Sequence, residues 1–214
     1  MGKRVIIAAG GRLGQWAAEL IRPKDMLIGA DRGALFLVQH GFCPDIAVGD
    51  FDSVTPEERE AVRSASGRFV SCDPVLKDDT DTELAFRLAL ELEPDDIRII
   101  GALGTRFDHS LANVHLLVQA LERGVACRLV DEFNVIRLTD GRMTVDDPEG
   151  RYPYVSLLPL TPEVTGLTLR GFQYPLTNHA IRMGRTLTMS NALAEPQGTV
   201  EIASGLLLVI QSRD

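Results

Sequence analysis

Two aspartates separated by one residue stand in the motif Gly49-Asp50-Phe51-Asp52-Ser53, directly after the apolar run 46–48. Side chains two positions apart project from the same side of an extended chain, so two like charges face one way. No Lys or Arg lies between them, and a divalent cation would relieve their repulsion. The alternative is a solvated turn, because Asp and Ser are favoured in turns.

A second acidic cluster, Asp78-Asp79-Thr80-Asp81, follows later in the chain. Oxygen ligands from both clusters would suit a hard cation such as Mg²⁺. The alternative is that these aspartates compensate the dipole at the start of a helix. The preceding Lys77 either balances the acids or reaches a phosphate as a point charge.

A glycine-rich turn, Gly101-Ala102-Leu103-Gly104, is followed by Arg106, Asp108 and His109. The guanidinium fork of Arg106 matches a phosphate, and a helix beginning near His109 would direct its N-terminal amides at an anion. Turn geometry alone also accounts for the glycines, and the spacing fits neither a P-loop nor a dinucleotide fingerprint. Together with the acids, the turn predicts a cation held beside a phosphate-bearing substrate.

The first 130 or so residues alternate between short apolar runs and helical patterns, which predicts a parallel α/β sheet. Capping signatures at Thr55-Pro56-Glu57-Glu58 and Thr80-Asp81-Thr82-Glu83 start two of the helices, and a third covers 111–121. Ligands of such sheets gather at the carboxyl ends of the strands, where the polar motifs fall. The predicted strands are 5–9, 26–30, 45–48, 68–71, 97–100 and 127–130.

The pattern changes after about residue 132 to short strand-like runs punctuated by Pro, Gly and Asn. The runs start near Val155, Val164, Leu187, Val200 and Leu206, and Ser204-Gly205 is a candidate hairpin turn between the last two. We therefore expect two domains, an α/β domain over 1–132 and a small all-β sandwich over 133–214.

Composition excludes some functions. The 214 residues carry a formal charge of −8 with no basic cluster, which argues against nucleic acid or an anionic membrane surface as a partner. Three cysteines without close spacing fit reduced thiols in a cytoplasmic protein. The N-terminal apolar run is shorter than a signal peptide requires.

These motifs, in this order, resemble those of the thiamine pyrophosphokinase family. The likeness rests on Ala30 to Ala34, the two acidic motifs, the turn from Gly101 through Asn113, and Ser190-Asn191. The resemblance implies a Rossmann-like α/β nucleotide domain followed by a β-sandwich, working as a homodimer. It implies transfer of the terminal diphosphate of ATP to the hydroxyl of thiamine, with release of AMP.

The resemblance also implies roles for individual residues. Asp50, Asp52 and Asp81 would be Mg²⁺ ligands, with Asp78 in the same catalytic acidic pocket, and Ser190 and Asn191 would bind thiamine. ATP would be bound by Asp31, Lys77, Gly101, Gly104, Arg106, Asp108, His109 and Asn113. Departures from the family pattern stand at Arg32, Thr105 and Ala192-Leu193.

Two alternatives remain at this point. One is a pyrophosphokinase for another hydroxymethylated heterocycle, such as a pterin. The other is a nucleotide- or thiamine-binding protein without turnover, although the carboxylates needed for turnover are present.

Overall fold

The computed structural model describes residues 2–71 and 79–214, and the chain divides into two compact units, 1–132 and 133–214. Within the described ranges, no helix is both long enough and apolar enough to cross a membrane. Lys77 and Asp78 lie outside the described residues.

The first unit alternates strands and helices, as predicted. Its strands are β1 (Arg4–Ala8), β2 (Met26–Ala30), β3 (Ile46–Gly49), β4 (Arg68–Ser71), β5 (Asp96–Ile100) and β6 (Ala126–Val130). Its helices are α1 (Gln15–Leu20), α2 (Arg32–Gln39), α3 (Pro56–Ala65), α4 (Asp81–Glu91) and α5 (Phe107–Glu122).

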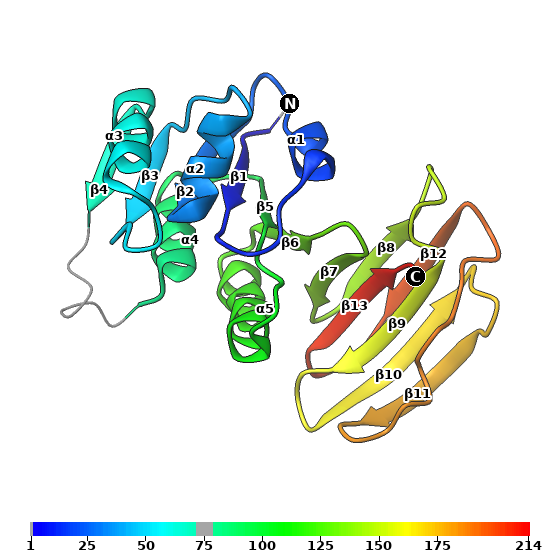
Figure 1. Cartoon of the computed structure of the whole chain (residues 1–214). Helices are drawn as coiled ribbons and strands as arrows, with labels where there is room; N and C mark the ends of the chain where they lie inside the picture. The colour runs from blue at the N-terminus through cyan, green and yellow to red at the C-terminus, as the bar shows by residue number, and fades with distance from the viewer. Residues whose placement is uncertain (1, 72–78) are drawn as a thin grey trace. The chain divides into compact units, whose positions relative to one another are not determined.

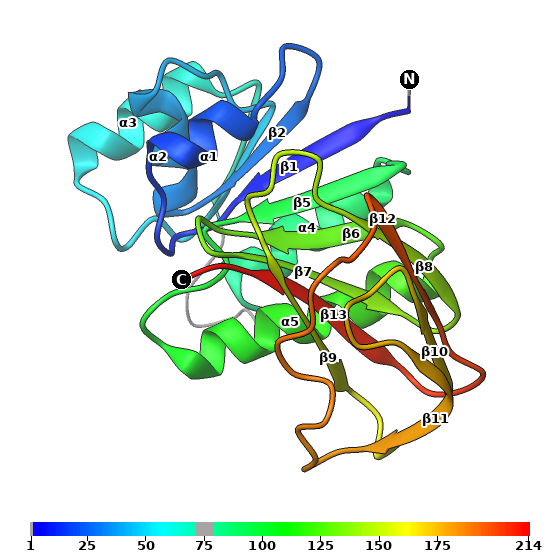
Figure 2. The ribbon, with the colours of Figure 1, turned by 90° about the vertical axis from the view of Figure 1, so that its right-hand side faces the viewer.

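The six strands are parallel and lie in the order β4-β3-β2-β1-β5-β6. The chain first runs outward from β1 to β4 and then crosses back to β5, so the direction reverses between β1 and β5. Helices α1, α2 and α3 lie on one side of the strands and α5 on the other (Figures 1 and 2), with α4 packed against α5. Ligands of open parallel sheets bind where the strand order reverses.

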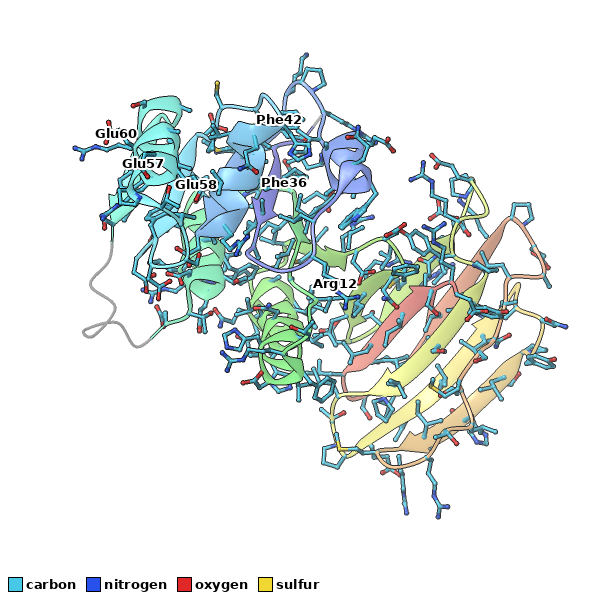
Figure 3. The ribbon with its side chains drawn as sticks, viewed as in Figure 1. Arg12, Phe36, Phe42, Glu57, Glu58 and Glu60 are labelled. Carbon is cyan, nitrogen blue, oxygen red and sulfur yellow. The ribbon has the colours of Figure 1, made fainter. Side chains whose placement is uncertain are left out.

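Local sequence explains why these elements begin where they do. The central strand β1 is an unbroken apolar run, and Val5, Ile6 and Ile7 are fully buried because helices cover both faces of the sheet. At the start of α3, the Thr55 side chain accepts a hydrogen bond from the Glu58 amide, and the Glu58 carboxylate accepts one from the Thr55 amide. This confirms the predicted capping box; Figure 3 shows Glu57 and Glu58 there.

The second unit is built from antiparallel strands in two groups, β7-β13-β9 and β11-β10-β12-β8. One hydrophobic core draws buried side chains from both groups, for example Leu157 and Val209 from the first and Leu167 and Val200 from the second. The unit is therefore the predicted sandwich. Its strands are β7 (Asn134–Thr139), β8 (Arg142–Asp146), β9 (Tyr154–Pro159), β10 (Glu163–Arg170), β11 (Leu176–Arg182), β12 (Gln197–Glu201) and β13 (Leu207–Ser212).

The sandwich differs from the prediction in several details. Strands β7, β8 and β11 are not among the predicted strand-like runs. Leu187 and Met189 lie in a turn, where both side chains are exposed, and not in a strand. Ser204-Gly205 does not close a hairpin, because β12 pairs with β10 and β8 whereas β13 pairs with β7 and β9. The turn instead carries the chain from one sheet to the other, which is how a sandwich differs from a simple meander.

Candidate active site

A cavity of about 460 Å³ opens in the first unit at the carboxyl ends of β1, β2 and β5, where the strand order reverses. Backbone from two strand ends meets there, since the Gly11 amide donates to the Gly101 carbonyl at 2.8 Å. The lining residues are Ala9, Gly10, Gly11, Ala30, Asp31, Arg32, Ser53, Thr80, Asp81, Thr82, Gly101, Ala102, Gly104, Thr105, Arg106, His109, Ser110 and Asn113.

Three carboxylates gather beside this cavity. One oxygen each from Asp31, Asp50 and Asp52 lies within 4.8 Å of the other two. Burial, and next the charge of the nearby Asp81, raise the pKa of Asp31 to about 6. Carboxylate oxygens this close fit a hard divalent cation, which would offset both the burial and the repulsion.

The second acidic motif opens α4. Thr80 caps the helix by accepting a hydrogen bond from the Glu83 amide at 3.2 Å, and Asp81 is the first helical residue. Both residues line the cavity, with the Asp81 side chain half-buried. Asp81 is thus placed by a helix cap, whereas Asp50 and Asp52 are placed by a turn after β3.

The glycine turn packs directly on β1. Gly101 has φ +67°, and a Cβ at this position would lie 2.6 Å from the Ala9 carbonyl oxygen. The buried Asn113 donates from Nδ2 to the Ala102 carbonyl at 2.7 Å, and the Gly104 amide donates to Ser110 Oγ at 3.1 Å. The turn is thereby fixed from α5, and Asn113 holds backbone as well as lining the cavity.

Arg106 and Asp108 form an exposed ion pair at the start of α5. Arg106 Nη2 lies 2.6 Å from Asp108 Oδ2, and Nε lies 3.3 Å from Oδ1. The hydrogen bond from Arg106 holds the pKa of Asp108 below its usual range. One edge of the guanidinium fork is therefore occupied, so a phosphate would have to use Nη1 or displace Asp108.

Ser190 and Asn191 lie in the second unit. Ser190 is exposed with φ +54°, and the buried Asn191 supports its neighbours. Asn191 Oδ1 accepts from the amides of Tyr174 and Ala192, and Nδ2 donates to the Tyr174 carbonyl. An amide has two N–H donors, so at most one is left for a ligand.

Several predicted residues come together and others do not. Those lining the cavity are Asp31, Asp81, Gly101, Gly104, Arg106, His109 and Asn113. Asp50 and Asp52 are not among the lining residues but lie next to Asp31, which lines the cavity. Asp108 does not line the cavity. Sequence reasoning missed Gly10, Gly11, Ser53, Thr82 and Ser110, among others. The first two directly follow a predicted strand, a signal that was available.

Comparison with known families covers both units. The family described as Thiamin pyrophosphokinase, catalytic domain, matches residues 17–129. The chain belongs to the thiamine pyrophosphokinase family. A second match, to the vitamin B1 binding domain of thiamin pyrophosphokinase, covers residues 142–207. The catalytic-domain match therefore includes most of the residues that line the cavity.

Individual relatives agree with this family. Thiamine pyrophosphokinase of Bacillus subtilis is 39% identical over 188 residues, 87% of this chain and 87% of its own length. Its crystal structure superposes with a TM-score of 0.91 at 35% identity, covering 99% of this chain and 100% of that one. The thiamin pyrophosphokinase structure from Geobacillus thermodenitrificans gives 0.87 at 36% identity, covering 99% and 98%. The fold is thus that of solved thiamine pyrophosphokinases.

Proposed function

We propose that this chain transfers the terminal diphosphate of ATP to the hydroxyl of thiamine, giving thiamine diphosphate and AMP. One observation carries the proposal. Three carboxylates lie beside a cavity at the point where the strand order reverses. The same chain matches both the catalytic and the vitamin B1 binding domain of thiamin pyrophosphokinase. The vitamin B1 match also favours thiamine over a pterin, and no observation favours a binding protein without turnover.

Asp50, Asp52 and Asp81 would hold Mg²⁺, with Asp31 beside them. The bound ion would neutralise charge on the nucleotide oxygens, which is most of what phosphoryl-type transfer asks of a protein. The acidic residues would also keep ATP from binding there without its cation, because like charges repel. Asp78 and Lys77 remain proposed members of the site on sequence grounds.

Arg106, His109 and the glycine turn would bind the phosphates of ATP. Helix α5 begins directly after Arg106, so its N-terminus favours an anion. Asn113 and Ser110 would support ATP binding indirectly, because their hydrogen bonds to Ala102 and Gly104 fix the glycine turn. Asp108 would orient the Arg106 fork until phosphate takes its place.

On the thiamine side, we propose Ser190 and Asn191 as binding residues and a homodimer in which each site draws on both chains. Asp52→Asn and Asn191→Ala subunits would then complement one another after mixing, because one of the two sites in each heterodimer would carry neither defect. The control is each parent reassociated with itself. Heterodimers without recovered activity would place each site within one chain.

We further propose cytoplasmic action, which fits the thiol content and the net charge of −8. The net negative charge also argues against binding to nucleic acid or to an anionic membrane surface.

The metal assignment is tested by Asp50→Asn and Asp52→Asn. Each change should leave the fold intact and reduce release of AMP from ATP and thiamine on the order of 100-fold or more. The matched control is Asp140→Asn, which neutralises an exposed aspartate in the second unit. Wild-type activity of an Asp52→Asn variant at limiting Mg²⁺ would refute the assignment.

A further inference from the structure

Phe51, the residue between the two aspartates, has a left-handed backbone. Its φ is +58°, a conformation that a bulky side chain rarely adopts unless its surroundings impose it. The Phe51 amide donates to Asp31 Oδ1 at 2.8 Å. The Asp31 carboxylate, which lies outside the turn, therefore fixes the turn at its central residue, Phe51.

The Phe51 side chain provides a second hold. The ring is 3% exposed and stacks on Phe69 with centroids 4.6 Å apart and planes 19° apart. It belongs to a hydrophobic cluster with Ala34, Leu35, Ala47 and Val62, contributed by β3 and two helices. With the ring fixed inward, the half-buried Asp50 and the exposed Asp52 on either side are turned away from the core.

Asp31 is itself fixed where β2 passes into α2. Its amide donates to the Val48 carbonyl at 3.0 Å, and its φ is +51°. Although Asp31 is the N-cap residue of α2, its side chain makes no capping bond to that helix among the described residues. Gly49 leaves room for it, since a Cβ there would lie 2.7 Å from Asp31 Oδ1. The carboxylate is thus committed to the turn and not to its own helix.

We propose that Asp31 is a positioning residue: its Oδ1 clamps the Phe51 amide and so holds the carboxylates of Asp50 and Asp52 together for the cation. The negative charge of Asp31 is not needed for this role, only its acceptor oxygen. The inference rests on the proposed function in one respect, that the two aspartates bind a divalent cation.

Two substitutions separate a clamp from a ligand. Asp31→Asn keeps an acceptor oxygen for the Phe51 amide and removes the charge. Asp31→Gly removes the acceptor while tolerating the positive φ, so backbone strain does not confuse the comparison. The readouts are Mn²⁺ affinity by calorimetry without nucleotide, and hydrogen exchange of the Phe51 amide by NMR. Circular dichroism checks that both variants fold.

Both variants lose the negative charge beside the cation, so a clamp shows in the difference between them: Asp31→Gly should bind Mn²⁺ about 10-fold or more weakly than Asp31→Asn, as second-shell losses do. The Phe51 amide should exchange faster in the Gly variant only. Equal, large losses of affinity in both variants would make Asp31 a ligand and overturn the proposal. Wild-type affinity and exchange in the Gly variant would overturn it as well.

The exchange measurement needs neither metal nor thiamine, so it decides on the clamp separately from the proposed function. If wild type binds no Mn²⁺, the metal role under the proposed function fails. Faster Phe51 exchange in the Gly variant alone would then still support the clamp, and unchanged exchange would refute it.

Discussion

Neutralising Asp31 should stabilise the metal-free protein. The pKa of Asp31 is raised from 3.8 to about 6, chiefly by burial and then by Asp81. The folded state therefore holds the proton more tightly than the unfolded state, and stability falls as the pH rises from about 4 to 6. A shift of this size corresponds to about 3 kcal/mol at most. Because solvent screens the half-buried group, about 1–1.5 kcal/mol is the better expectation.

The assay is urea denaturation of wild type and Asp31→Asn in EDTA at pH 4 and pH 7.5. The variant should be more stable by about 1–1.5 kcal/mol at pH 7.5, and the difference should nearly vanish at pH 4, where wild-type Asp31 is protonated. Asp140→Asn serves as the control for loss of an exposed carboxylate. A variant no more stable than wild type at pH 7.5, or a gap that does not change with pH, would refute the reasoning.

Three further outcomes follow from the same geometry. Gly49→Ala should destabilise the fold by about 1–3 kcal/mol because of its φ of +148° and the crowding against Asp31, measured by urea denaturation against Gly141→Ala, where space is open. Asn113→Ala should cost about 1–3 kcal/mol, because the Ala102 carbonyl loses its donor. Arg106→Ala should raise the Michaelis constant for ATP, with partial rescue by Lys, which lacks the planar fork; unchanged ATP kinetics in both variants would make Arg106 structural.

Local signals predicted much of the first unit. Unbroken apolar runs marked strands buried on both faces, and the Thr55–Glu58 capping box marked the start of α3. The strand-end rule then brought Asp31 and Gly101 to one cavity. Gly10 and Gly11 also follow a predicted strand and line the cavity. They carry no polar side chain, so the search for polar motifs at strand ends did not include them.

Features that depend on distant contacts were not predictable from local pattern. The Phe51 amide donates to Asp31, 20 residues away, and the backbone of Tyr174 bonds to the side chain of Asn191, 17 residues away. In the sandwich, β7, β8 and β11 were not predicted as strands. Most side chains of β11 are exposed, so this strand has no apolar alternation. Leu187 and Met189 show the opposite case. Two apolar residues two positions apart match the alternation of a strand, but both side chains are exposed in a turn.

The central claim is tested most directly by following the phosphorus atoms. The protein is incubated with ATP, Mg²⁺ and thiamine, and the products are identified by ³¹P NMR. Diphosphate transfer predicts AMP and thiamine diphosphate in equal amounts, with both phosphorus atoms of the product derived from the β and γ positions of ATP. ADP with thiamine monophosphate, or no thiamine-dependent product from folded protein, would contradict the account.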